Sequence, residues 1–137
     1  MYEKLTDFIP ILKDDEFGDW VIDHENDGTI QHPIQMPFVT YGQAVRGLEA
    51  AIYDFMDTNH PFKNGDYGKI LEENGMEWGV ESMSAKDVSS ADANCIIAML
   101  IGAVRAERFC DGALLDFLKR GCIQRWLGRL KEMDESQ

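Results

Sequence analysis

The fold of this chain is decided by residues 91–108, which have the sequence ADANCIIAMLIGAVRAER. From Cys95 to Val104 the side chains are apolar almost all round, which is typical of a helix buried inside a protein. This run is ten residues long, well short of the roughly 18 consecutive apolar residues that a membrane-spanning helix needs. We therefore predict a central helix from Ala91 to about Arg108, capped by Ser90 and enclosed by the rest of the molecule.

Regular apolar spacing predicts three further helices around this one. Upstream, Thr40 and Gln43 have the spacing of a capping box, and an amphipathic helix is expected from there to about Thr58. Downstream, one helix ends at Gly121 and another follows it directly, so both should be antiparallel to or steeply crossed with their neighbours. The apolar positions of these three helices are Ala44, Val45, Leu48, Ala51, Ile52, Phe55 and Met56, then Leu114, Leu115, Phe117 and Leu118, then Ile123, Trp126, Leu127, Leu130 and Met133.

Turn and strand signals occur mainly in the first forty residues. An opening helix with apolar residues from Leu5 to Leu12 should be short or kinked, because Pro10 lacks an amide donor. Residues 20–22 have strand character, and the sequence Asn-Asp-Gly at 26–28 predicts a hairpin turn. The return limb, residues 29–38, contains two prolines and belongs at a sheet edge or is broken. Residues 38–40 are expected to form a further short strand.

Residues 59–83 have a weak pattern. Asp66 is expected to cap a short helix that Gly75 ends, and no element is assigned to the segment around Trp78. Ser84 and Asp87 suggest a single capped turn. With 137 residues, no internal repeat and no low-complexity linker, the chain is predicted to be one α+β domain over residues 1–137: a mainly helical body, a small antiparallel hairpin near the N-terminus and a C-terminal three-helix segment.

Charge is distributed unevenly along the chain, whose net charge is −12. Residues 1–92 contain 6 Lys and Arg against 19 Asp and Glu, whereas residues 93–137 contain 7 against 6. Such an acidic chain is repelled by nucleic acids and anionic membranes, so we expect neither direct nucleic-acid binding nor membrane binding. A basic protein partner is compatible with this charge, although negative charge also simply keeps proteins soluble.

The cysteines and the N-terminus suggest a cytoplasmic location. Cys95, Cys110 and Cys122 are odd in number and lie in stretches predicted to be helical, whereas secreted domains usually have paired cysteines in loops. Reduced and mostly buried thiols are therefore expected. The first residues lack the basic and apolar blocks of a signal peptide.

The first candidate site consists of charged residues at the end of the central helix: Arg105, Glu107, Arg108 and Asp111. On a helix Arg105 and Arg108 lie on neighbouring faces, and Arg108 could pair with Asp111 three residues on. Guanidinium groups suit carboxylates and phosphates, so a small anion could bind here. The alternative, which we favour from sequence, is a structural ion-pair network where a buried helix emerges.

Histidines and carboxylates around the hairpin form a second candidate: Asp23, His24, Glu25, Asp27 and His32. With a two-residue loop at Asp27-Gly28, His24 and His32 would lie on opposite faces of the ladder, which is unsuitable for a shared metal. No zinc-binding motif is present. We therefore expect surface polarity in this hairpin, and no metal or cofactor anywhere in the chain.

Thiol and aromatic residues supply two weaker candidates. Cys110 follows Arg108 closely and is the best of the three cysteines for nucleophilic chemistry, but it has no histidine nearby in sequence. Trp20 and Trp78 flank loops, where an exposed indole would indicate a ligand cleft or an interface. Burial is the default expectation for both, and Trp126 is expected to lie in the core.

Three short patterns resemble a known family. They are Phe8-Ile9-Pro10, then Met36-Pro37 with Tyr41 four residues on and a helix behind it, then Arg105-x-x-Arg108-Phe109-x-x-Gly112 followed by two leucine-rich helices. Together they resemble a family of small bacterial proteins of unknown function, over about Leu5 to Met133, and the segment from His60 to Met83 departs most from the pattern. The resemblance implies an uncharacterised protein of the bacterial cytoplasm and carries no site residue with it.

These observations leave three functional hypotheses. The preferred one is a non-catalytic protein-binding or regulatory module, because strong charge asymmetry occurs without any recognisable catalytic set. Motifs for nucleotide hydrolysis, acyl transfer and deamination are all missing. The second is a protein or minor enzyme that binds a small anion through Arg105 and Arg108. The third is self-association through the C-terminal helical stripes.

Overall fold

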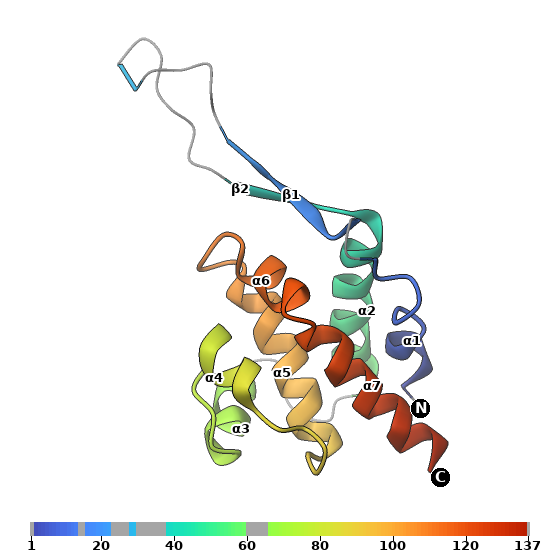
Figure 1. The fold of residues 1–137 in the computed structure, drawn as a ribbon. Helices are drawn as coiled ribbons and strands as arrows, with labels where there is room; N and C mark the ends of the chain where they lie inside the picture. Colours follow the sequence, from blue (N-terminus) through green and yellow to red (C-terminus); the bar gives the residue numbers. More distant parts are fainter. Residues whose placement is uncertain (1, 14–15, 23–27, 30–37, 60–65, 137) are drawn as a thin grey trace.

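The computed structural model describes residues 2–13, 16–22, 28–29, 38–59 and 66–136. Within these ranges a helical body carries a two-stranded sheet (Figure 1). The elements are α1 (Glu3–Thr6), β1 (Gly18–Val21), β2 (Phe38–Tyr41), α2 (Gln43–Asn59), α3 (Tyr67–Glu73), α4 (Val80–Ala85), α5 (Ala93–Ala106), α6 (Ala113–Lys119) and α7 (Cys122–Glu135). The predicted α+β class is confirmed.

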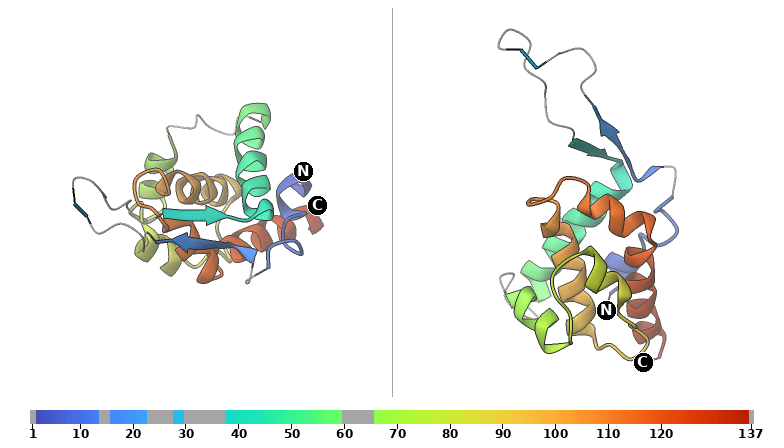
Figure 2. Two further views of the ribbon diagram at one scale, coloured as in Figure 1. Left: turned by 90° about the horizontal axis from the view of Figure 1, so that it is seen from above. Right: turned by 60° about the vertical axis from the view of Figure 1, so that its left-hand side comes forward.

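The helix α5 lies at the centre of the molecule, as predicted. Every residue from Cys95 to Val104 is buried, and α2, α3, α6 and α7 all pack on α5. Figures 1 and 2 show these helices on its different sides. The cap was predicted at the wrong residue: α5 begins at Ala93, and the Asp92 carboxylate, not Ser90, accepts a hydrogen bond of 2.8 Å from the Cys95 amide.

The helices α2, α6 and α7 occupy the predicted ranges, and their apolar stripes face the core. The opening helix is short, as expected, because α1 ends at Thr6 and irregular turns continue to Ile11. It packs against α2 and α7. The backbone amide of Tyr2 donates to the Asp134 carboxylate at 2.8 Å, so the first and last elements lie side by side (Figure 1).

The two strands form an antiparallel pair in which Trp20 lies opposite Val39. They stand at one end of the helical body, near α2 and α6 (Figure 1). The strands predicted at residues 20–22 and 38–40 both fall in this one small sheet, although β1 ends at Val21. The predicted register is wrong: a two-residue loop at Asp27-Gly28 would place Trp20 opposite Gln35, whereas Trp20 lies opposite Val39. Gly28 has the positive φ of 88° that the predicted turn requires. The remaining turn and return limb, with Asp23, His24, Glu25, Asp27 and His32, lie outside the described residues.

The segment between α3 and α5 contains one helix that the sequence pattern did not predict. Asp66 and Gly75 flank α3 as expected, although the Asp66 side chain makes no capping hydrogen bond. Ser84 lies inside α4, so the capped turn predicted from Ser84 to Asp87 is wrong. The Asp87 carboxylate accepts from the Ser89 amide at 3.0 Å instead. A helix as short as α4 offers only Val80, Met83 and Ala85 as apolar positions, too few for a periodic signal.

Candidate functional site

The end of α5 and the start of α6 are joined by residues 107–112, and the Glu107 carboxylate organises this connection. Its oxygens accept hydrogen bonds from the amides of Gly112, at 3.0 and 3.1 Å, and of Leu114, at 3.0 Å. The first amides of a helix have no partner within the helix and attract negative charge. Glu107 therefore occupies the place at the N-terminus of α6 that an external anion would otherwise take.

Tyr41 of β2 completes this arrangement. Its hydroxyl donates to Glu107 Oε1 at 2.5 Å and accepts from the Leu115 amide at 3.0 Å. Burial, followed by the hydrogen bond to Glu107, raises the pKa of Tyr41 far above its ordinary value. The phenol thus stays protonated and continues to donate. These contacts attach the sheet to α6 and fix the backbone of residues 107–112.

The predicted anion site is not assembled as a cluster. The Arg105 guanidinium lies over the Tyr67 ring at 5.5 Å, and that of Arg108 lies over the Tyr53 ring at 5.9 Å. The Nε atom of Arg105 is buried without a hydrogen-bond partner among the described residues. Neither arginine lines any of the hollows described here. Stacking of a guanidinium on an aromatic ring is a common structural use of arginine.

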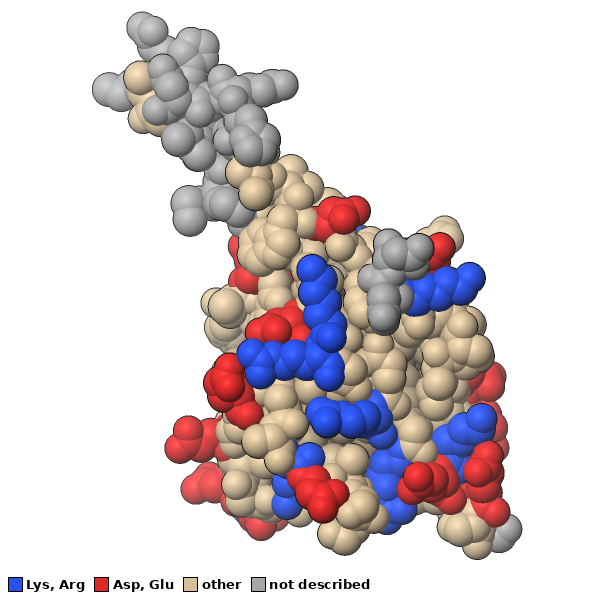
Figure 3. Space-filling model, viewed as in Figure 1, with Lys and Arg blue, Asp and Glu red and all other residues tan. Residues whose placement is uncertain are grey.

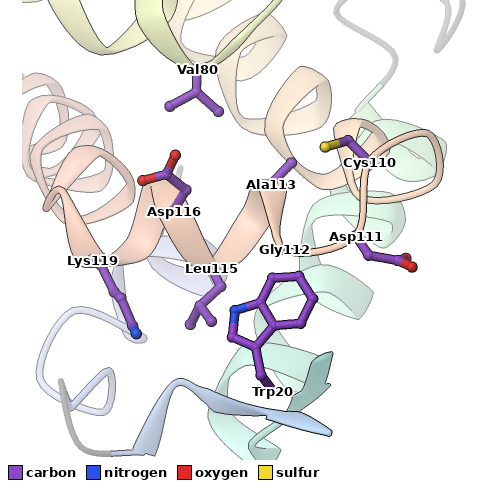
Figure 4. A pocket seen from close by; sticks show the side chains of 9 residues that line it. All are labelled: Trp20, Val80, Cys110, Asp111, Gly112, Ala113, Leu115, Asp116 and Lys119. Carbon is purple, nitrogen blue, oxygen red and sulfur yellow. The ribbon is translucent and has the colours of Figure 1, made fainter. Parts of the chain in front are cut away.

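The pair predicted between Arg108 and Asp111 does not form within the described part of the chain. The helix α5 ends at Ala106, so the helical spacing on which that prediction depended is lost before Arg108. Asp111 has no partner among the described residues, and its side chain points outward (Figure 4). Of the four charged residues singled out from sequence, only Glu107 holds other groups in place.

A groove with aromatic walls lies next to this connection. It consists of two adjoining hollows of about 380 and 270 Å³ that share Val80, Cys110 and Ala113. Trp20 and Leu115 line the larger hollow, shown in Figure 4, and Trp78 and Phe109 line the smaller. We call this surface the aromatic groove: Trp20, Trp78, Val80, Phe109, Cys110, Ala113 and Leu115.

Both tryptophans singled out from sequence line this groove, and neither is buried. Trp20 is 46% exposed and Trp78 is 41% exposed, so the default expectation of burial is wrong for both. Trp20 reaches from β1 to the first turn of α6 (Figure 4). A Cβ at Gly112, where φ is +91°, would lie 2.3 Å from the Trp20 ring. Only glycine allows that close approach. Trp126 is fully buried, as predicted.

The smaller hollow is held open by a chain of aromatic contacts. The Trp78 indole donates to the Gly102 carbonyl of α5 at 2.8 Å. Its ring meets Tyr67 edge-on at 5.7 Å between centroids and Phe109 at 5.4 Å. Phe109 is nevertheless 72% exposed. The walls of the groove are also linked across α4 and α6 by an exposed ion pair of 3.0 Å between Glu81 and Arg120.

Cys110 lies where the two hollows meet. Its thiol is exposed, whereas those of Cys95 and Cys122 are buried. The expectation of burial is thus correct for two cysteines and wrong for Cys110, which lies in a loop and not in a helix. The groove gives this thiol no histidine, since none of its lining residues is one.

Phe109 is the main site residue that sequence reasoning did not select. It stands beyond the last apolar position of α5 and three residues before Gly112. An aromatic residue that follows the charged end of a buried helix and precedes a turn cannot belong to the apolar stripe of that helix. This position outside the stripe is the signal that could have identified it.

The described ranges contain no group of three or more His, Cys, Asp or Glu side chains arranged to hold a metal ion. Among the same residues, no helix has both the length and the apolar character required to span a bilayer.

Fold and groove together define a small α+β domain that presents an aromatic surface groove at the end of a helical bundle. Over residues 2–136 the chain matches the family of unknown function DUF6508, and it belongs to that family. Comparison with curated proteins and with solved structures finds no match.

Proposed function

We propose that this domain is a non-catalytic protein-binding module of a bacterial cytoplasm, and that its aromatic groove binds an apolar segment of a basic partner protein. The observation that carries the proposal is the exposure of three large aromatic side chains, Trp20, Trp78 and Phe109, around two adjoining hollows. Tryptophan and phenylalanine are enriched at protein interfaces, and tryptophan is among the residues that contribute most to binding energy.

Two parts of the groove are held in place by hydrogen bonds within the protein. Trp78 is fixed by its hydrogen bond to the Gly102 carbonyl, and the backbone of residues 107–112 is held by Glu107 and Tyr41. Binding to a surface that is already ordered loses less conformational entropy than binding to a mobile one. This supports recognition by a preformed site.

The chemistry of the partner follows from charge. Asp111, which has no partner among the described residues, lines the larger hollow together with Asp116 and Lys119, and the whole chain carries a net charge of −12. Complementary potentials favour a partner segment in which a large apolar residue is flanked by Lys or Arg.

The test is a selection of peptides from a random displayed library on the wild-type protein. Phe109→Ala serves for counter-selection, because this exposed side chain contributes little to the core. We expect enriched peptides with a large apolar residue beside Lys or Arg. Their affinity should fall about tenfold on Phe109→Ala and decrease with added salt. Bound peptide should also slow alkylation of Cys110 by iodoacetamide.

The matched control is Ile11→Ala. Ile11 is 48% exposed and lies outside the groove, so this variant should bind the selected peptides as the wild type does. The proposal fails if no peptide distinguishes wild type from Phe109→Ala, or if Ile11→Ala weakens binding equally.

A further inference from the structure

A third hollow, of about 400 Å³, lies away from the aromatic groove, between α7 and the loop that joins α4 to α5. Two arginines of α7 attach this loop to the helix. Arg125 donates to the Ser84 carbonyl at 3.3 Å, and Arg129, one turn later, donates to the Ala91 carbonyl at 3.2 Å. The loop is thus fastened at both ends and arches over one turn of α7. We call the space below it the α7 hollow: Asp87, Val88, Ser89, Arg125, Gly128, Arg129 and Glu132.

Gly128 lies below the arch, and packing within the protein does not account for it. A Cβ added at Gly128 would meet no atom within 4 Å, so an alanine would fit. Glycine in the interior of a helix is unfavourable relative to alanine, because it loses more backbone freedom on folding. The missing side chain leaves room for a bound molecule to approach the α7 backbone.

The charges that line the α7 hollow are only partly neutralised within the protein. Glu132 pairs with Arg129 at 3.5 Å. Arg125 contacts only the Ser84 carbonyl and the Cys122 sulfur, so its positive charge faces no carboxylate among the described residues. The Asp87 carboxylate accepts from the Ser89 amide at 3.0 Å, and this bond, the hydrogen bond from the Ser89 side chain and the nearby Lys86 lower the pKa of the carboxyl.

The two unpaired charges are therefore of opposite sign and lie on opposite walls, Arg125 on the helix and Asp87 on the loop. A simple anion would satisfy Arg125 but would be repelled by Asp87 and Glu132. A ligand that carries both charges would satisfy both walls. The face on which α6 and α7 run carries Lys and Arg at its centre, with many Asp and Glu side chains around its edge (Figure 3).

We propose that the α7 hollow binds a small zwitterion of the amino-acid type, with its carboxylate on the free N–H groups of Arg125 and its ammonium group against Asp87. Both contacts of Arg125 within the described part of the chain are made by Nη2, so its Nε and Nη1 N–H groups are free to donate charge-assisted hydrogen bonds to a carboxylate. Arg125 is already held by the Ser84 carbonyl, so little ordering is needed. This site is separate from the aromatic groove and does not depend on the function proposed for it.

The test measures the unfolding midpoint and calorimetric binding of the full chain with each of the common L-amino acids. Acetate, methylammonium and inorganic phosphate serve as probes that carry one kind of charge. We expect at least one amino acid to bind and to raise the midpoint, and the three simple ions to have no comparable effect. Binding of acetate or phosphate as strong as that of every amino acid would overturn the zwitterion proposal, and so would the failure of all amino acids to bind.

Gly128→Ala separates a binding role from a structural one. The added methyl group should raise the unfolding midpoint by a few degrees through helix propensity, while it takes up the space in which the ligand approaches the α7 backbone and weakens amino-acid binding at least tenfold. Arg125→Gln should abolish binding. It also removes the hydrogen bond to the Ser84 carbonyl, but this bond is exposed, so the midpoint should fall only slightly. Lys131→Ala, on an exposed position of α7 outside the hollow, is the matched control and should bind normally. A stabilised Gly128→Ala that binds as well as wild type would overturn the proposal.

Discussion

Two aromatic pairs in this molecule have nearly the same distance between ring centroids and opposite environments. The centroids of Phe117 and Trp126 are 5.5 Å apart, and both rings are fully buried beside α5. The centroids of Trp78 and Phe109 are 5.4 Å apart, and these rings are 41% and 72% exposed. The first pair contributes to folding through burial. The second leaves apolar area in water, which folding alone does not require.

Contact between two aromatic rings does not by itself mean that the rings stabilise the fold, because that depends on whether they are buried. An aromatic pair in the core removes apolar area from water and stabilises the fold. An exposed pair that is held in place by hydrogen bonds to the backbone gains little from the hydrophobic effect. Such a pair is better explained by a partner molecule that binds over the two rings. Substitutions in each pair test whether it contributes to folding or to binding.

The largest effect is expected in the buried pair. Trp126→Ala should lower the free energy of unfolding by about 3–5 kcal/mol, because it leaves a large cavity beside α5. Urea denaturation followed by circular dichroism measures the change.

Phe109→Ala is the matched substitution in the exposed pair. It should change the free energy of unfolding by no more than about 0.5 kcal/mol, as is usual at exposed positions. If Phe109→Ala lowered the free energy of unfolding as much as Trp126→Ala does, the Trp78–Phe109 pair would be a structural element. The basis for an interface there would then be removed.

An intermediate effect is expected at Glu107, which holds the exposed pair in place without belonging to it. Glu107→Gln replaces one accepting oxygen by an amide donor that would face the amides of α6. We expect a loss of about 1–3 kcal/mol in unfolding free energy. Because residues 107–112 would loosen, Cys110 should also react faster with a thiol reagent such as Ellman's.

Tyr41→Phe is the control for that effect, since it removes one hydroxyl and leaves the carboxylate in place. Tyr41→Phe should lower the free energy of unfolding by about 0.5–1.5 kcal/mol. An unchanged reaction rate at Cys110 in Glu107→Gln would contradict the role assigned to this carboxylate.

A pH-dependent effect is expected at Glu49 of α2, whose side chain is half-buried. Burial raises the pKa of the Glu49 carboxyl, and the nearby Glu107 adds to this, whereas Arg46 and Arg108 oppose it. A carboxyl whose pKa is raised by folding favours the folded state at low pH, and this contribution is lost as the pH rises through the raised pKa.

Glu49→Gln should therefore be more stable than the wild type at pH 7, and the difference should vanish toward the ordinary pKa of glutamate, about 4.3. Thermal unfolding from pH 4 to pH 8 measures this. Glu72→Gln, at an exposed position of α3, controls for the general benefit of removing one negative charge. If the unfolding midpoint of Glu49→Gln followed that of Glu72→Gln at every pH, the raised pKa assigned to Glu49 would be contradicted.

The buried pair was predictable from sequence and the exposed pair was not, for a physical reason. Phe117 and Trp126 lie on regular apolar stripes, and burial of one face of a helix imposes a spacing that a single sequence displays. The same holds for α5, whose Cys95–Val104 run is apolar all round. The helix α4 was missed because a short helix has too few apolar positions to show a period.

The groove depends on contacts that leave no local pattern. Trp78 meets Phe109, and Tyr41 meets Glu107 across 66 positions of the sequence. The charged residues at the end of α5 were noticed for their chemistry, but their partners came from distant elements. Arg105 and Arg108 lie over tyrosines, and Glu107 binds the amides of the next helix. Trp20 and Trp78 were noticed as candidates, and it took the fold to show that they line one surface with Phe109.

The hydroxyl of Tyr41 makes one amide proton of α6 a reporter for the sheet. The Leu115 amide has that hydroxyl, and no carbonyl of its own helix, as its acceptor. Its exchange with deuterated solvent therefore records how often β2 separates from the helical body, and a molecule that held the two strands in place would slow it without touching α6.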